Sequence, residues 1–153
     1  MFKKILIAYD GSAQSKHALD HAAEMADSCK GQLVILTVVP REGLPVFPTD
    51  GMSPEPVLTN QDWEEYQEKM KANYQKSQED ALKDVKEHYP KLKVDAIILD
   101  GRPSSTIVEQ AEKNQADLIV MGSRGLGGIT GWILGSTSRR VVESCTKPIL
   151  IIK

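Results

Sequence analysis

Short, almost wholly apolar runs alternate along this chain with longer segments of helical periodicity, and this alternation limits the fold more than any other feature. The apolar runs cover residues 5–9, 33–39, 94–99, 118–121 and 149–152. Most of them lack alternating polar residues, which is typical of strands covered by helices on both faces. They are also rich in the β-branched residues that strands favour. We therefore expect five buried, parallel strands.

Helical periodicity fills the intervals between these runs. The expected helices cover about residues 12–29, 61–88, a segment that opens at residue 103, and residues 135–144. In the first of them Leu19, Ala22 and Ala26 fall on one face, and Gly31 suits the end of the helix. The order βαβ, long helix, βαβαβ predicts an α/β fold: a doubly wound five-stranded parallel sheet with helices on both faces and right-handed crossovers.

A proline-rich segment interrupts the alternation after the second apolar run. Residues 40–56 contain five of the eight prolines. Proline can neither donate to a strand ladder nor continue a helix, so we expect a loop excursion at about residues 40–60. No second core follows it, and a chain of 153 residues suits one core. A single domain over residues 1–153 is therefore expected.

Several other side chains are expected to have structural or surface positions rather than to bind a ligand. Apolar residues at helical spacing predict a stripe on the long helix that packs in the core or in a dimer: Trp63, Tyr66, Met70, Tyr74, Ala81 and Val85. His17 and His21 are four residues apart, but they lie opposite the apolar face, so a solvated face is expected. Cys29 and Cys145 match no metal-ligand or redox spacing, which suits reduced thiols in the cytoplasm.

The charge balance disfavours some classes of partner. The formal net charge is −2 and the pI is about 5.9, whereas proteins that bind nucleic acids usually carry a basic face. No apolar run is long enough to span a bilayer, and the run at residues 5–9 is too short for a signal peptide. We expect a cytoplasmic protein with no nucleic-acid or membrane partner.

Glycines concentrate after the fourth apolar run. Six of the eleven lie between residues 122 and 135. Glycines let the backbone approach a ligand closely, and successive N–H groups can form an anion-binding nest. Gly135 opens the last helix, whose N-terminus favours phosphate, and hydroxyl donors follow at Ser136, Thr137 and Ser138. A flexible surface loop with Ser136 as an ordinary N-cap is the alternative, but apolar residues among the glycines favour an ordered loop.

The glycine spacing distinguishes between known phosphate-binding motifs. No Gly-Lys pair of a P-loop is present, and the turn after the first strand lacks the dinucleotide fingerprint. Gly122, Gly125, Gly135 and Ser136 instead match Gly-x₂-Gly-x₉-Gly-Ser/Thr, and in this the chain resembles the ATP-binding subgroup of the universal stress protein family. The resemblance extends from the first strand to the closing residues 147–152. It implies an adenine nucleotide α-hydrolase-like, Rossmann-like fold.

The resemblance also implies roles for particular residues, with ATP and Mg²⁺ as cofactors. Asp10 would approach the ribose or a Mg²⁺ ion bound to the phosphates. The backbone around Ala8 and Val38 would flank adenine, with main-chain hydrogen bonds from Val38. Ribose and phosphates would be wrapped by Gly122, Ser123, Arg124, Gly125, Leu126, Gly127 and Gly128, with Arg124 as a countercharge. The triphosphate would be held by Gly135, Ser136, Thr137 and Ser138. The proline-rich segment looks longer than in many members, so the rim of this pocket departs from the family pattern.

The sequence is compatible with three functions. The first is a nucleotide-dependent regulatory protein of the stress response, read by an unknown downstream protein. It would hydrolyse ATP slowly at most, because glycine nests bind phosphates without supplying a base. Asp10 could act as a general base, but no histidine or second carboxylate accompanies it in a motif, and no catalytic residue is predicted. The second is an ATP-using enzyme, a pyrophosphatase or transferase, although the loop motifs usual in such enzymes are absent. The third is a ligand-free structural partner, which the glycine spacing disfavours. The resemblance further implies a homodimer through the C-terminal strand, Ile149–Ile152.

Overall fold

A five-stranded parallel sheet forms the centre of the molecule. The computed structural model describes residues 1–41, 46–49, 52–56, 59–126 and 134–153, with residues 46–49 and 52–56 described by their backbone. The strands of the sheet are β1 (Lys4–Ala8), β2 (Gln32–Pro40), β5 (Lys93–Gly101), β6 (Leu118–Gly122) and β7 (Ile149–Ile152), in the order β5-β2-β1-β6-β7. Each pairing is parallel. The fold class predicted from the sequence is therefore confirmed.

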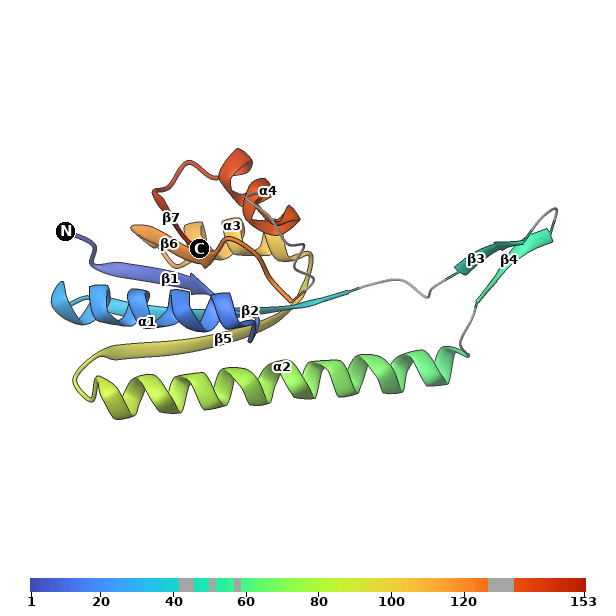
Figure 1. Ribbon diagram of the computed structural model, residues 1–153, viewed down its shortest axis with the longest axis horizontal. Coiled ribbons are helices and arrows are strands. Elements are labelled where there is room, and N and C mark those ends of the chain that lie inside the picture. Colours follow the sequence, from blue (N-terminus) through green and yellow to red (C-terminus); the bar gives the residue numbers. More distant parts are fainter. Residues whose placement is uncertain (42–45, 50–51, 57–58, 127–133) are drawn as a thin grey trace.

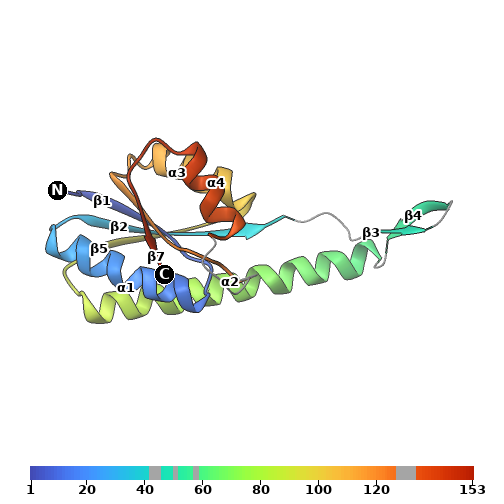
Figure 2. The same cartoon turned by 45° about the horizontal axis from the view of Figure 1, so that its top comes forward.

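Helices cover both faces of this sheet. They are α1 (Ala13–Ser28), α2 (Asn60–His88), α3 (Pro103–Lys113) and α4 (Ser136–Ser144). Figures 1 and 2 show α1 and α2 on one face and α3 and α4 on the other. Two hydrophobic clusters correspond to these two faces. Among the described residues, no helix combines the length and the apolar character that crossing a membrane requires.

The proline-rich segment differs from the prediction of a loop. Within it the backbone forms a two-stranded antiparallel sheet of β3 (Val46–Thr49) and β4 (Met52–Pro56). The pairing shifts register between Phe47 and Thr49, so Pro48 lies at the irregularity. Prolines are tolerated at such irregularities and on edge strands, where the missing N–H does not interrupt a ladder. Both strands of this two-stranded sheet are edge strands, so its prolines are compatible with strand structure.

The central strand is buried on both sides. Ile5, Leu6 and Ile7 of β1 have no exposed surface, and burial of each such side chain contributes about 1.5–3 kcal/mol. Their alternation places Leu6 in the cluster under α3 and α4, and the other two in the cluster under α1 and α2. Burial of these three side chains fixes the position of β1, and the candidate site lies at the carboxyl end of this strand.

A buried amide joins α2 to the sheet. The Nε2 group of Gln78 donates to the carbonyl of Ile35 in β2 at 3.1 Å and to the carbonyl of Ile97 in β5 at 2.7 Å. Gln78 is 5% exposed. Because a buried polar group costs free energy unless it is hydrogen-bonded, these contacts fix both the height and the rotation of α2 above the sheet.

Candidate functional site

The carboxyl ends of β1 and β6 are neighbours at the point where the strand order reverses. From β1 the chain proceeds outward to β2 and β5, whereas from β6 it proceeds to β7 on the other side. Ligands of open α/β sheets bind at such switch points. The segments that follow these two strands, residues 9–12 and 122–126, contain many of the site residues predicted from the sequence.

Asp10 links the two segments through main-chain amides. Its Oδ1 accepts a hydrogen bond from the Ser12 N–H at 2.9 Å, and its Oδ2 accepts one from the Leu126 N–H at 3.1 Å. Hydrogen bonds to an ionised acceptor are shorter and stronger than neutral ones. The carboxylate therefore fixes the beginning of the glycine-rich loop beside the carboxyl end of β1.

The glycines of this loop are required by close approach. A Cβ atom on Gly125 would lie 2.5 Å from Oδ2 of Asp10. A Cβ atom on Gly122 would lie 3.1 Å from both the Cβ of Gln14 and the carbonyl oxygen of Arg124. A side chain at Gly125 would displace the Asp10 carboxylate or the loop, and one at Gly122 would require its neighbours to shift by a few tenths of an ångström. The structure thus supplies a steric reason for two of the glycines identified by their spacing.

Gln14 is a site residue that the sequence interpretation missed. Its Oε1 accepts hydrogen bonds from the Arg124 N–H at 2.7 Å and from the Ser123 hydroxyl at 3.1 Å. It lies in the first turn of α1, four residues after Asp10. A signal was available, because the parallel order places the first turn of α1 beside the end of β6. A glutamine at this position, however, belongs to no recognised motif.

The turn after β1 also contacts α2. Gly11 has φ +84°, a conformation that glycine adopts without the steric cost of a side chain, and a Cβ atom there would lie 2.6 Å from the Ser77 hydroxyl. The same hydroxyl lies 3.3 Å from the Tyr9 hydroxyl. Tyr9 is buried, and this burial raises the pKa of its phenol. Helix α2 is thereby packed directly against the turn that positions Asp10.

The start of α4 is tied to the end of β6. The Gly135 N–H donates to the Ser123 carbonyl at 2.8 Å, and the Ser138 hydroxyl donates to the same carbonyl at 2.9 Å and to the Gly135 carbonyl at 3.0 Å. The Ser138 hydroxyl is therefore engaged within the protein. Gly135 caps the helix without a side-chain bond, and Ser136 is exposed while Thr137 is half-buried. The helix N-terminus thus presents main-chain donors and these two hydroxyls.

The remaining predicted residues fall into three groups. Ala8 and Val38 lie near the carboxyl ends of neighbouring strands and share the hydrophobic cluster under α3 and α4. Arg124 is half-buried beside Gln14. Gly127 and Gly128 lie outside the described residues, so their predicted roles remain predictions.

The described residues do not form a metal centre of their own. Within them, no three His, Cys, Asp or Glu side chains are grouped so that they could hold an ion. Asp10 is therefore at most a single carboxylate ligand, which is compatible with Mg²⁺ because this ion commonly keeps waters and binds through one carboxylate and substrate phosphates. His17 and His21 are both exposed, as predicted, with ring centroids 4.8 Å apart.

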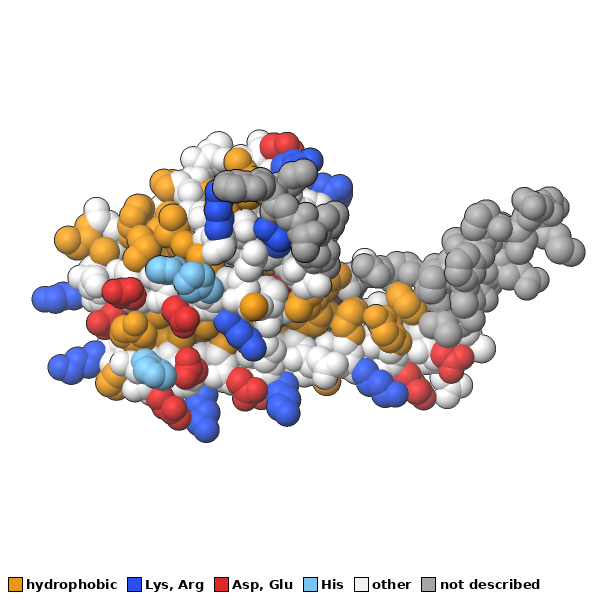
Figure 3. Space-filling view, viewed as in Figure 1, with side chains coloured by type: hydrophobic (Ala, Val, Ile, Leu, Met, Phe, Trp, Pro, Cys, Tyr) orange, Lys and Arg blue, Asp and Glu red, His pale blue; other side chains and the backbone are white. Residues whose placement is uncertain are grey.

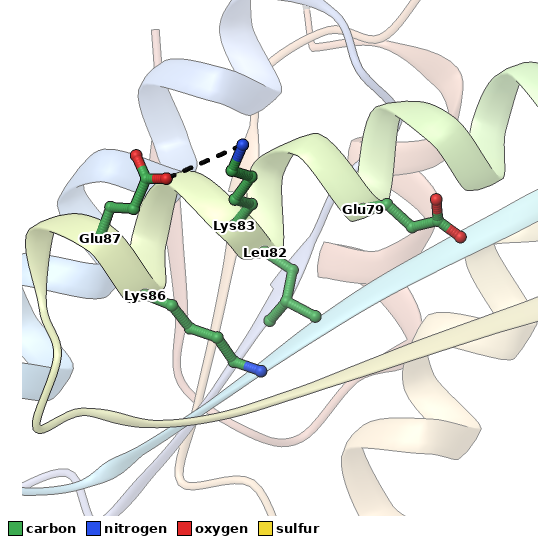
Figure 4. Close-up of a pocket in the computed structure, with 5 residues that line it drawn as sticks. All are labelled: Glu79, Leu82, Lys83, Lys86 and Glu87. Atoms are coloured by element: carbon green, nitrogen blue, oxygen red, sulfur yellow. Dashed lines mark ion pairs between the residues drawn. The ribbon is translucent and has the colours of Figure 1, made fainter.

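A shallow hollow on α2 is distinct from this site. Its lining residues all belong to α2: Glu79, Leu82, Lys83, Lys86 and Glu87. Figure 4 shows these side chains on successive turns, with Lys83 paired to Glu87 at 3.9 Å. Ion pairs between exposed side chains contribute little free energy, and no main-chain donors converge here as they do beside Asp10. The switch point therefore remains the better candidate.

Comparison with known proteins identifies relatives of the whole chain. Residues 1–153 match the model of the universal stress protein family. Universal stress protein MJ0531 of Methanocaldococcus jannaschii is 34% identical over 155 residues, covering 100% of this chain and 83% of that protein. The structure of UspA from Lactobacillus plantarum superposes with a TM-score of 0.80 at 23% identity, covering 99% and 97% of the two chains, and shows the same fold.

A further solved structure bears on the ligand. It is a crystal structure of a universal stress protein in complex with cAMP. That protein is 25% identical to this chain, with a TM-score of 0.69, and the match covers 99% of this chain and 97% of the other. A protein of the same fold and similar length therefore binds an adenine nucleotide.

Proposed function

Since the chain belongs to the universal stress protein family, we propose that it binds ATP with Mg²⁺ at the switch point between β1 and β6 and acts as a nucleotide-dependent regulatory protein. The observation that carries this proposal is the close approach of the Gly122–Gly125 backbone to Asp10 and Gln14. It brings main-chain amides and one carboxylate together where the strand order reverses. The related protein with bound cAMP supports an adenine nucleotide as the ligand class.

Different site residues would bind different parts of the nucleotide. Glycines in the loop allow amides to approach a polyanion, and the N-terminus of α4 adds its partial positive charge. Asp10 orients the loop. Its carboxylate would accept hydrogen bonds from the ribose hydroxyls or hold a Mg²⁺ ion, which neutralises phosphate charge when bound. Val38 and Ala8 would border the adenine ring.

Hydrolysis is expected to be slow. Among the described residues, no histidine or second carboxylate is hydrogen-bonded to Asp10. A general base must be positioned to take the proton of the attacking water, and Asp10 is assigned here to the ribose or Mg²⁺. ATP turnover well above ~1 per second would fall in the ordinary enzyme range and would contradict the regulatory proposal in favour of an ATP-using enzyme.

Calorimetric titration of Mg·ATP into wild type and two variants tests the binding site. In Gly125→Ala the new methyl group would collide with Asp10, so we expect at least ~10-fold weaker binding, which is a loss of about 1.4 kcal/mol. Val142→Ala is the control, because it removes an exposed side chain of α4 that lies outside the loop and the helix N-terminus. Its affinity should stay within about threefold of wild type.

Equal affinities in both variants would refute the proposal that the loop binds the nucleotide. No heat from wild type would refute nucleotide binding altogether and leave the ligand-free structural role. Thermal unfolding of each variant shows whether a lost affinity reflects the loop or the whole fold.

We also propose that the chain forms a homodimer through β7, Ile149–Ile152. This strand is an edge of the sheet, and all its side chains are half-buried. An exposed apolar edge is a liability that proteins cover or pair, and a second copy paired across a two-fold axis would extend the sheet. Sedimentation at micromolar concentration should give a dimer, and a monomer at that concentration would contradict this proposal.

A further inference from the structure

The side-chain amide of Gln14 has one end engaged by the glycine-rich loop and one end open. Its Oε1 accepts hydrogen bonds from the Arg124 N–H at 2.7 Å and from the Ser123 hydroxyl at 3.1 Å. The oxygen of a glutamine side chain has two lone pairs, and the nitrogen carries two N–H donors. The two bonds therefore use the whole acceptor capacity of this side chain and none of its donor capacity.

The partners of Gln14 settle which end of the side chain is the oxygen. Oxygen and nitrogen of a glutamine amide are assigned from their hydrogen-bond partners. A main-chain N–H group is only a donor, so the atom that lies 2.7 Å from the Arg124 nitrogen must be an acceptor, which is Oε1. Nε2 is consequently the end that does not face the Arg124 amide.

The Nε2 atom of Gln14 is accessible from outside the protein. No described residue accepts a hydrogen bond from it. It is also not one of the buried side-chain atoms that lack a partner, in contrast to Nε2 of Gln67. A polar atom that is neither bonded nor buried is open to solvent or to a ligand. Because Gln14 is half-buried and its oxygen is held by two bonds, this donor is fixed in place.

The surroundings of this donor favour an anion. Gln14 lies in the first turn of α1, and the start of α4 is tied to Ser123, so both helices begin at the carboxyl ends of β1 and β6. A helix N-terminus has N–H groups without partners in the helix and a partial positive charge. Figure 3 shows Lys and Arg side chains around α4, and Arg139 and Arg140 of this helix are exposed.

We propose that Nε2 of Gln14 donates hydrogen bonds to the phosphate oxygens of the bound nucleotide while Oε1 holds the loop. This inference rests on the proposed function, which supplies the nucleotide. Gln14 thereby joins two roles in one neutral side chain, because it positions the Arg124 amide and adds a donor next to it. A glutamate could hold the loop equally well but would repel phosphate, so the neutral amide makes the site selective for an anion.

Gln14→Glu separates the two ends of the side chain. The carboxylate keeps an acceptor for the Arg124 N–H but replaces the donor with a negatively charged oxygen. We expect Mg·ATP to bind at least ~10-fold more weakly in calorimetry, while hydrogen exchange of the Arg124 amide stays within about threefold of wild type. Gln14→Met removes both the acceptor and the donor. It should weaken Mg·ATP binding and also raise exchange at Arg124 at least ~10-fold.

Gln115→Glu is the matched control for the added charge. Gln115 is exposed and follows α3, just before Asp117, whose N–H donates to the Lys4 carbonyl at the amino end of β1. The new carboxylate therefore lies at the opposite end of the sheet from the candidate site, where salt screens it from a bound phosphate. Its affinity for Mg·ATP should stay within about threefold of wild type.

The side-chain amide signals of Gln14 provide a test in the wild-type protein. These ¹⁵N–¹H signals are assigned by their absence from Gln14→Glu. They should shift on saturation with Mg·ATP and shift much less with adenosine, which has no phosphate. This measurement decides the question if Gln14→Glu also loses protection at Arg124, because it needs no change in the loop.

Two results would overturn the inference and leave the nucleotide site in place. One is Gln14→Glu that binds Mg·ATP as tightly as wild type. The other is a set of Gln14 side-chain signals that do not respond to Mg·ATP, or that respond equally to adenosine. Either result would limit Gln14 to holding the loop. If wild type binds no Mg·ATP, the proposed function and this inference fail together.

Discussion

At the scale of single residues, the turn after β1 concentrates the contacts that shape the candidate site. Asp10 binds the loop after β6, Gly11 allows α2 to approach, and Ser12 caps α1 through the Ser15 N–H. Tyr9, immediately before them, joins the same turn to Ser77. A change at any of these residues therefore acts on two or three elements at once.

Tyr9 is expected to make stability depend on alkaline pH. Burial raises the pKa of its phenol, and the hydrogen bond with Ser77 opposes this shift in part. A folded-state pKa above the unfolded value of about 10 means that this contribution is fully present below pH ~10 and is lost as the pH rises through the folded pKa. The free energy of unfolding should therefore decline above pH ~10.

Urea denaturation between about pH 9 and pH 11.5 measures this decline. Tyr9→Phe should show a shallower decline than wild type, because it has no phenol to ionise. Tyr66→Phe, which changes an exposed ring, should keep the wild-type slope. Equal slopes in wild type and Tyr9→Phe would show that Tyr9 does not govern the effect.

At the scale of elements, the two longest helices both begin with a side-chain cap, but we expect the loss of that cap to affect the stability of the protein differently in the two helices. Ser12 caps α1, which lies on the sheet along its length. Thr59 forms a capping box with Asp62 at the start of α2, where this helix extends past the end of the sheet (Figure 1). Loss of a cap typically costs about 1 kcal/mol. In α1 that cost falls on the whole fold, but at the start of α2 it falls on a segment that can open locally.

Paired cap variants distinguish these two situations. Ser12→Ala should lower the melting temperature by about 2–4 °C. Thr59→Ala should leave it nearly unchanged and raise amide exchange roughly fivefold in the first turns of α2, measured in dilute protein. A fall in melting temperature of the same size in both variants would mean that the start of α2 is as firmly fixed as α1.

Sequence periodicity predicted the sheet and the helices well because both faces of the sheet are covered. The predicted strand at residues 33–39 is β2, Gln32–Pro40, and the predicted helix at residues 61–88 is α2, Asn60–His88. The hairpin β3–β4 escaped prediction because proline content dominates local propensity there. Gln14 and Gln78 escaped because their roles depend on distant main-chain partners, which no local pattern specifies.

For the candidate site, spacing and topology were informative in different ways. The spacing of Gly122, Gly125 and Gly135 indicated a loop with close backbone approach, and the order of strands placed it beside Asp10. The involvement of the Ser138 hydroxyl in bonds within the protein was not predictable, because a serine at a helix start can equally donate to a ligand. The side chain that sets the height of the loop, Gln14, likewise required the folded structure.

At the scale of the whole molecule, the sheet separates three surfaces. The candidate site lies at the carboxyl end of the central strands, β7 forms one edge, and α2 lies toward the other edge beside β5. Helix α2 also contacts the turn that carries Asp10 through Ser77. The same sheet therefore positions the candidate site at its centre and the edge strand β7, through which we propose a homodimer, at one side.

Amide chemical shifts during titration of ¹⁵N-labelled protein with Mg·ATP test the central claim most directly, namely that main-chain amides at the switch point bind the nucleotide. We predict the largest shifts at residues 10–12, 122–128 and 135–138, with saturation at one equivalent. If these amides keep their shifts while only those around Lys83 and Lys86 on α2 respond, the proposed nucleotide site is wrong.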